Sequence, residues 1–564
     1  MFSTLEAAAM TQLLFLPFRS LHRRRNVLVI LCLFLTVGCV VTPLLAQRGE
    51  KAVPRPVQID WLAAVRDAQT LSPQLSTNPT NLPPRLRARV ADRLARFAIK
   101  DGTAPLALLN ELVIDLIPGV ATIPIPVLVP FETTRFLAEK ARVKADSPRL
   151  QPGEHRHYLY GAGGTLQLVA DTTGYDALVT YEPDALRDLG VASTRRRMVH
   201  IAGASQSYGG DQPGELVEDM QAQFPGLRRQ QNDNEVAYTF RKYGAPYFAV
   251  VSCSDRPLDP NGYKCEQAEA LLRIAVRNLR LIGGNPLPVR TRASPVLLPR
   301  PTRVSPDFQY HAPGKLLDGT DDDGTQQGSA DRNTYGDILF PIKTPPNYAQ
   351  PQVFMHVGNC LSTTGTTNKM VPLPKQTGDK HARYHCKQNA KQLLHWEGNP
   401  ENYGYPWRDN FCESRLGKVG STPECPARRG HQGQDIRPSS CPGPADSETC
   451  QTDVHAVVAV AKGNACRDGN KLRLRFNSTT LYYVYLHMNT NTMDAAHIPD
   501  LQCTPVEANR VIGKVGNFQD VIGGTTTHLH FEIHPVDPMS RYNPYMTLIR
   551  AYERRIGAIG TELP

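Results

Sequence analysis

The order of hydrophobic and polar residues divides the chain into an apolar start, a mixed middle and a β-rich C-terminal part. Val27–Val41 is almost entirely apolar and is interrupted only by Thr36 and Gly38. Residues 105–131 are also strongly apolar, but they contain acidic side chains and several prolines, which would break a membrane-spanning helix. We therefore expect this second apolar region to pack inside a domain.

Short apolar runs and helical spacing predict a mixed α/β domain in the middle of the chain. The runs Leu166–Ala170, Ala177–Tyr181 and Tyr247–Cys253 are rich in branched and aromatic residues, as is typical of strands. Apolar residues at helical spacing predict a helix over Glu266–Leu281. This part of the chain contains no recognisable catalytic motif, and its role is unassigned.

Changes in composition predict a multi-domain protein. Asn285–Pro306 is rich in proline and arginine and Gly314–Asn333 is polar, which is typical of a linker. A chain of 564 residues is also too long for a single core. The expected parts are a signal peptide or membrane anchor (1–47), a helical and apolar connecting region (48–150), the mixed α/β domain (151–285), a Pro-rich and polar linker (286–340), a β-rich domain (341–545) and a C-terminal helix (546–564).

The first apolar run has the features of an export signal. His22–Arg25 places positive charge on its N-terminal side, which keeps that side in the cytoplasm and sends the remainder across the membrane. Residues 26–46 reach the ~20 residues that span a bilayer, and Leu44–Ala46 also suits cleavage by a signal peptidase. An inner-membrane anchor and a cleaved signal peptide both remain open.

The net charge and the cysteines fit an exported protein. A net charge of +10 attracts anionic cell-wall polymers or lipid headgroups, although a merely soluble basic surface explains it equally well. Of twelve cysteines, Cys32 and Cys39 lie in the first apolar run, which leaves 12 − 2 = 10 for disulfides. Cys253 and Cys265 are expected partners. The other pairings stay open among Cys360, Cys386, Cys412, Cys425, Cys441, Cys450, Cys466 and Cys503.

A histidine and an aspartate lie four residues apart in Gly430–Ile436. His431 and Asp435 are both residue types that zinc accepts as ligands. Gly433 favours a strand or loop, in which positions separated by an even number can project to the same side. Taken alone, two surface polar residues in a glycine-containing turn are the more common explanation of this motif.

Two later strands supply three more histidines. Thr527–Ile533 alternates polar and apolar residues, so His528 and His530 are expected on one face. Leu529, Phe531 and Ile533 are expected to be buried on the opposite face. Leu481–Met488 is rich in aromatic and branched residues and also predicts a strand, with His487 on the same face as two tyrosines. For each strand taken alone, the alternative is that its histidines have no role in metal binding or catalysis.

Taken in order, these motifs resemble the lysostaphin-type zinc endopeptidases of the bacterial cell wall. The signature of that family is His-x-x-x-Asp followed by His-x-His, and the resemblance covers about residues 340–545. It implies an antiparallel β-rich peptidase domain with an open groove. The insertion Pro438–Thr452, the cysteines and Thr525–Thr527 depart from the family pattern and bear on the range of substrates.

The resemblance also implies a role for each residue of the motifs. His431, Asp435 and His530 correspond to the ligands of one Zn²⁺ per chain, with water as the fourth ligand. His487 and His528 correspond to the residues that accept the proton of the water and stabilise the attacked carbonyl oxygen. Which of these two histidines has which role stays open, and Glu532 receives no role.

The expected function is therefore hydrolysis of peptide cross-links in peptidoglycan by a zinc metalloendopeptidase. Its partners would be stem peptides and, through the N-terminal segment, the cell-envelope membrane, but not nucleic acid. It would act in the periplasm or cell envelope. A further expectation is that residues 151–285 cover the groove and restrain the activity, with a binding or spacer role as the alternative. The alternatives are a catalytically silent cell-wall-binding regulator that activates a separate amidase, and an unrelated zinc hydrolase.

Overall fold

The computed structural model describes most of the chain after residue 51. Residues 51–564 form one compact unit. The expected export segment lies outside the described residues, and no helix in the described part of the chain is both long and apolar enough to cross a membrane. The described residues are 52–71, 84, 87–91, 104–114, 116–142, 158–161, 164–209, 214–232, 234–254, 263–286, 298–316, 328–349, 407–413, 430–438, 452–476, 480–525, 527–536 and 541–563, with the backbone of short strands between 360 and 386.

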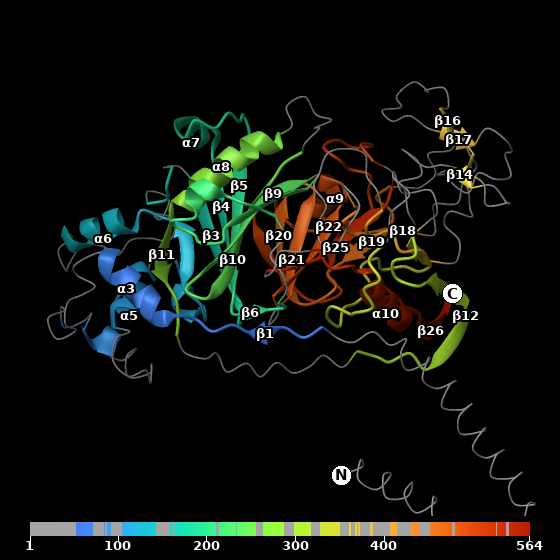
Figure 1. Cartoon of the computed structure of the whole chain (residues 1–564), viewed down its shortest axis with the longest axis horizontal. Helices are drawn as coiled ribbons and strands as arrows, with labels where there is room; N and C mark the ends of the chain where they lie inside the picture. The colour runs from blue at the N-terminus through green and yellow to red at the C-terminus, as the bar shows by residue number, and fades with distance from the viewer. Residues whose placement is uncertain are drawn as a thin grey trace, which may run out of the picture. The chain divides into compact units, whose positions relative to one another are not determined.

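Two seven-stranded antiparallel sheets dominate the structure, which is β-rich with few helices (Figure 1). The N-terminal sheet has the order β3-β4-β5-β10-β9-β8-β7, and the C-terminal sheet has the order β13-β18-β25-β22-β21-β20-β23. Their strands are β3 (Thr165–Ala170), β4 (Gly174–Tyr181), β5 (Arg197–Ala204), β7 (Glu215–Leu216), β8 (Arg228–Asn232), β9 (Glu235–Lys242), β10 (Ala245–Ser252), β13 (Asn347–Ala349), β18 (Gln434–Pro438), β20 (Gly463–Asp468), β21 (Lys471–Phe476), β22 (Leu481–Leu486), β23 (Cys503–Val506) and β25 (Leu529–Pro535).

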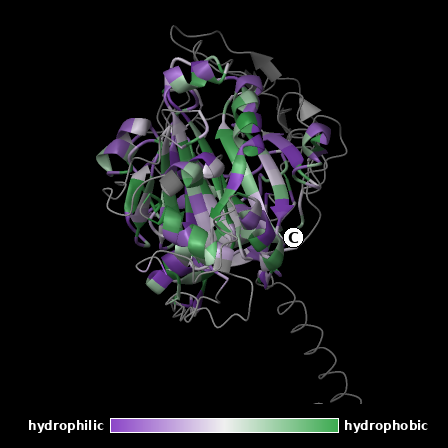
Figure 2. Cartoon of the chain, turned by 90° about the vertical axis from the view of Figure 1, so that its left-hand side faces the viewer, coloured by the Kyte–Doolittle hydropathy of each residue, from purple (hydrophilic) through white to green (hydrophobic). Residues whose placement is uncertain are grey.

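The N-terminal sheet shares one large apolar core with the helices around it. The second apolar region of the sequence is part of this core, as expected, because α5 (Ala104–Val113) and β2 (Val127–Pro130) are buried in it. Hydrophobic residues lie along the central strands, while the peripheral helices carry hydrophilic patches (Figure 2). Other elements near this sheet are β1 (Arg55–Pro56), which pairs with β6 (Gln206–Ser207), α3 (Trp61–Leu71), η3 (Val120–Thr122), α6 (Thr133–Arg142), α7 (Pro183–Asp188) and η5 (Glu218–Met220).

The helix expected over Glu266–Leu281 is shorter than its apolar spacing suggests. Helix α8 spans Cys265–Arg277, and Leu279–Gly283 forms strand β11, which pairs with β2. Apolar residues continue past the end of the helix because β11 is itself buried. The helical period in the sequence therefore runs on into a strand.

The two sheets pack against each other through an apolar cluster and buried polar contacts. Arg475 of β21 forms an ion pair with Asp171 at 2.6 Å and donates to the backbone oxygen of Tyr175. The Tyr482 hydroxyl donates to Asp176 of the N-terminal sheet. The two halves therefore share one interior, whose apolar members are Ala202, Ala204, Ala237, Phe248, Val250, Tyr482, Val484, Leu486 and Val536.

The described part of the expected linker belongs to the C-terminal core. Strand β12 (Arg303–His311) pairs in parallel with β26 (Ala558–Leu563), and Phe308 packs against Trp407. The expected helix over 546–564 is also only partly present: α10 (Tyr545–Ile556) ends where Gly557 takes a positive φ of 68°, and the chain continues as β26. The remaining elements are β19 (Ala456–Val458), which pairs with β24 (Val511–Lys514), α9 (Thr490–Ala495), β14 (Cys360–Leu361), β15 (Thr367–Asn368), β16 (Met370–Pro372) and β17 (Tyr384–Cys386).

Disulfides stabilise both halves of the molecule. Cys253 is joined to Cys265, as expected, and this bond ties the end of β10 to the start of α8. Cys466 and Cys503 form a second bond between the neighbouring strands β20 and β23. Cysteine pairs are typical of proteins that fold in an oxidising compartment.

Candidate metal centre

Strands β18 and β25 bring two residues of the predicted site side by side. Asp435 and His530 are direct neighbours in the antiparallel register of these strands. Strand alternation places the apolar residues of β25 in the C-terminal core, where Leu529 and Phe531 are fully buried, so His530 lies on the opposite face. The predicted alternation of this strand is confirmed.

Three ligand atoms converge at this point. The distance from His431 Nε2 to His530 Nδ1 is 2.8 Å, that from His530 Nδ1 to Asp435 Oδ1 is 3.0 Å, and that from His431 Nε2 to Asp435 Oδ1 is 3.2 Å. A tetrahedral ion bound at ordinary zinc distances separates its ligand atoms by about 3.3 Å. All three side chains are buried, and together they form a group that can hold a metal ion. The donor set and its spacing fit zinc.

The outer nitrogen of each histidine ring has its own oxygen partner. His431 Nδ1 lies 2.7 Å from the backbone oxygen of Asn410, and His530 Nε2 lies 2.8 Å from Glu532 Oε1. Since an oxygen acceptor needs a donor, each outer nitrogen carries a hydrogen. In the neutral ring the inner nitrogen then has a lone pair available for a metal ion.

Charge is concentrated at the centre. Burial raises the pKa of the Asp435 carboxyl, but the histidines around it, His431 and His528 first, outweigh burial and hold that pKa well below its usual range. Burial lowers the pKa of His530, but its hydrogen bonds to Asp435 and Glu532 outweigh burial and raise the pKa to about 9. Asp435 is therefore ionised, as a metal ligand must be.

His487 reaches the site through a turn at the end of a strand. β22 ends at Leu486, and His487 has a positive φ of 71°. The prediction that His487 shares a face with Tyr483 and Tyr485 was wrong, because both tyrosines are buried in the C-terminal core. The change in backbone direction brings the His487 ring beside His528 instead, with ring centroids 4.5 Å apart. Strand alternation alone could not reveal this turn.

His528 and His487 lie beside the three converging atoms. His528 Nε2 is 3.4 Å from Asp435 Oδ1, and the backbone nitrogen of His528 bonds to the oxygen of Gly516. His487 Nδ1 lies 2.9 Å from the backbone oxygen of Phe518 and therefore donates to it. The structure thus brings together all five residues of the predicted site.

A small cavity opens next to His487, between the two sheets. Its volume is about 190 Å³, and its lining includes Leu486 and Phe518 from the segments that hold His487. Arg195 and Arg197 of the N-terminal half and Asp468 of the C-terminal half add charged groups to the lining. The cavity therefore reaches the residue that precedes His487, and its lining comes from both halves.

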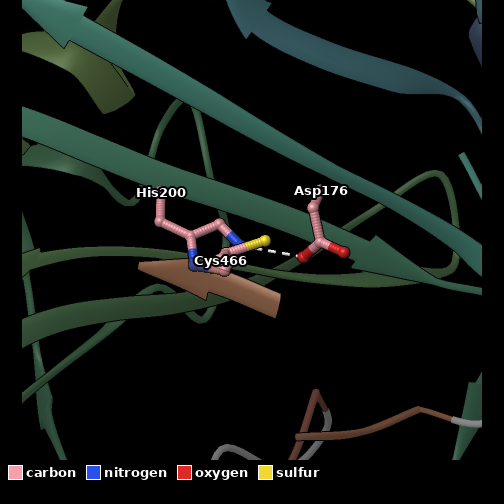
Figure 3. Close-up of side chains that lie close together, drawn as sticks. All are labelled: Asp176, His200 and Cys466. Atoms are coloured by element: carbon pink, nitrogen blue, oxygen red, sulfur yellow. Dashed lines mark hydrogen bonds and ion pairs between the residues drawn. The ribbon is translucent and has the colours of Figure 1, made fainter. Parts of the chain in front are cut away.

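A second group of metal-ligand types lies at the interface of the sheets. Figure 3 shows Asp176, His200 and Cys466 with their side-chain ends close together. His200 Nε2 is 2.8 Å from Asp176 Oδ1, and both residues are buried. Because the sulfur of Cys466 is bonded to Cys503, it is not a thiolate ligand. Sequence alone does not pair Asp176 with His200, since they lie on the different strands β4 and β5.

The comparisons leave the family open. Neither models of known protein families nor curated proteins match this chain.

The candidate metal centre offers two imidazole nitrogens and one carboxylate oxygen for a divalent cation, with two further imidazoles beside them. Such a set is able to bind a cation and to transfer protons next to it.

Proposed function

We propose that the protein is a zinc-dependent metalloendopeptidase that hydrolyses peptide cross-links in bacterial peptidoglycan. The observation that carries this proposal is the convergence of His431 Nε2, Asp435 Oδ1 and His530 Nδ1 within 3.2 Å of one another. Catalytic zinc sites use three protein ligands and keep a fourth position for water, whereas structural sites use four protein ligands. The two additional histidines supply the acid-base groups that hydrolysis needs.

Each residue has a role that follows from its position. His431, Asp435 and His530 would hold the ion, which when bound polarises a carbonyl and lowers the pKa of water to about 7. His487 donates from Nδ1 to Phe518, so its Nε2 is an acceptor that can take a proton from the attacking water. His528 is left to donate to the developing negative charge on the carbonyl oxygen.

The choice of substrate rests on the sequence together with the surroundings of the site. The order of the motifs resembles lysostaphin-type peptidases, and the N-terminal segment has the features of an export signal. Two disulfides in the described residues suit a protein that works outside the cytoplasm. A net charge of +10 favours binding to an anionic wall.

The proposal is tested by measuring zinc content and the release of muropeptides from purified peptidoglycan. The exported chain should bind about one zinc and release new peptide ends. His431→Ala should lose both zinc and activity, while His528→Ala should keep zinc and lose activity. His497→Asn is the matched control, because His497 is exposed and asparagine tolerates its positive φ of 57°.

Two results would contradict the proposal. A folded chain that binds no zinc would remove the metal centre altogether. Stoichiometric zinc without cleavage of any wall preparation would favour the silent regulator that activates a separate amidase.

A further inference from the structure

Glu532 lies directly behind one of the candidate metal ligands. It occupies the same face of β25 as His530, and it is 3% exposed. Its Oε1 is 2.8 Å from His530 Nε2, and its Oε2 contacts His534 Nε2. Both carboxylate oxygens of Glu532 are therefore hydrogen-bonded to histidines of its own strand.

The contact with Glu532 fixes which nitrogen of the His530 ring carries a hydrogen. A carboxylate oxygen accepts hydrogen bonds, and Glu532 Oε1 lies at hydrogen-bonding distance from His530 Nε2, so His530 donates from Nε2. The other nitrogen of the ring, Nδ1, is the one that faces Asp435 and His431.

The face of β25 that carries Glu532 lies toward the N-terminal sheet. The register of β21, β22 and β25 places Arg473, Val484 and Glu532 in one row across the sheet. Arg473 and Lys471 form buried ion pairs with Glu235 of the N-terminal sheet. Val484, the direct neighbour of Glu532 in the register, belongs to the apolar cluster between the sheets, so the N-terminal sheet covers this face of β25.

We infer that Glu532 is a positioning residue, which keeps the proton of His530 on Nε2 and directs Nδ1 toward the metal ion. This inference rests on the proposed function. A carboxylate that accepts the outer N–H of a metal-bound histidine fixes the orientation and tautomer of the ring, and its loss typically weakens metal binding about 10- to 100-fold. The competing explanation is a structural role, in which Glu532 only neutralises its buried surroundings.

Zinc affinity separates these explanations. The dissociation constant for zinc is measured by competition with a chromophoric chelator, and the thermal stability of each metal-free protein is measured in parallel. Glu532→Ala should weaken zinc binding about 10- to 100-fold. Glu532→Gln keeps an oxygen that accepts from His530, so it should recover part of this loss. Glu553→Gln is the matched control, since Glu553 is a buried carboxylate of α10 that pairs with Arg550.

The outcomes are distinct. Weaker zinc binding in Glu532→Ala, partial recovery in Glu532→Gln and unchanged binding in Glu553→Gln support the inference. If Glu532→Ala does not fold, a several-fold loss in a folded Glu532→Gln supports it. Wild-type zinc affinity in either folded Glu532 variant overturns it, even where stability falls. If the wild-type chain binds no zinc, the proposed function fails together with the inference.

Discussion

At Gly433 the main chain passes so close to His530 that a side chain has no room. A Cβ at this position would lie 2.5 Å from His530 Nε2 and 2.7 Å from the backbone oxygen of Phe531. Neither group can move away easily, because His530 is hydrogen-bonded on both sides and Phe531 is paired with β18. Glycine therefore allows the loop of His431 to approach the strand of His530.

We predict that Gly433→Ala displaces the His530 ring and lowers the affinity for zinc. The loss should be at least about tenfold, as when the hydrogen-bond partner of a metal-bound histidine is removed. Chelator competition measures the affinity. Gly226→Ala is the control, because a Cβ there meets nothing within 4 Å and only the positive φ of 76° opposes it. Equal zinc affinities in the two variants would show that the close approach is unimportant for the metal.

His311 of β12 makes stability depend on pH. It is buried, and burial, followed by the charges of Arg408 and Lys315, lowers its pKa to about 4. The unfolded chain binds this proton near pH 6.5 and the folded chain only near pH 4. The contribution of neutral His311 is therefore fully present above pH 6.5 and is lost as the pH falls toward 4.

His311→Phe should thus melt with a shallower dependence on pH between 6.5 and 4 than the wild-type chain does. Thermal unfolding in a series of buffers measures this slope. The exposed His497→Asn variant should follow the wild-type slope. If His311→Phe follows it as well, the acid sensitivity arises at other groups.

At the scale of single elements, sequence periodicity predicts which residues share a face of a strand better than it predicts where the strand ends. Alternation predicts the face of β25 that carries His530, because Leu529 and Phe531 on either side of it are buried in the C-terminal core. The end of β22 cannot be predicted in this way, since Leu486 and His487 continue the apolar and aromatic pattern of the strand up to the turn. The resemblance assigns no role to Glu532, and its contacts with His530 and His534 are visible only in the structure.

The turn after β22 allows the chemistry of His487 to be separated from its backbone shape. Asparagine tolerates a positive φ better than most residues do, so His487→Asn should keep the turn and remove the imidazole. We expect normal zinc binding and a loss of cleavage of about 10²- to 10⁴-fold, the usual range for a general acid or base. Muropeptide release and zinc content measure the two effects. Unchanged cleavage would exclude His487 as the proton acceptor.

At the scale of the whole molecule, the contact between the sheets could not be predicted from the sequence. Lys471–Phe476 alternates basic and apolar residues, which is typical of a strand with one face in solvent. In the structure the basic face is buried, and its partners Glu235, Asp171 and Asp176 lie more than two hundred residues away along the chain. A local pattern does not contain information about partners at that distance.

This buried contact predicts that the C-terminal half is not stable alone. Glu235 pairs with Lys471, Arg473 and Arg541, and breaking a buried ion pair costs about 3–5 kcal/mol. Residues 335–564 without the N-terminal sheet would lose this carboxylate and expose the apolar residues of β22 that now face that sheet. Calorimetry should therefore give one unfolding transition for the exported chain, a lower melting temperature for Glu235→Gln, and aggregation or strong destabilisation of the fragment. A fragment that melts as the full chain does would instead make the N-terminal half a separable domain.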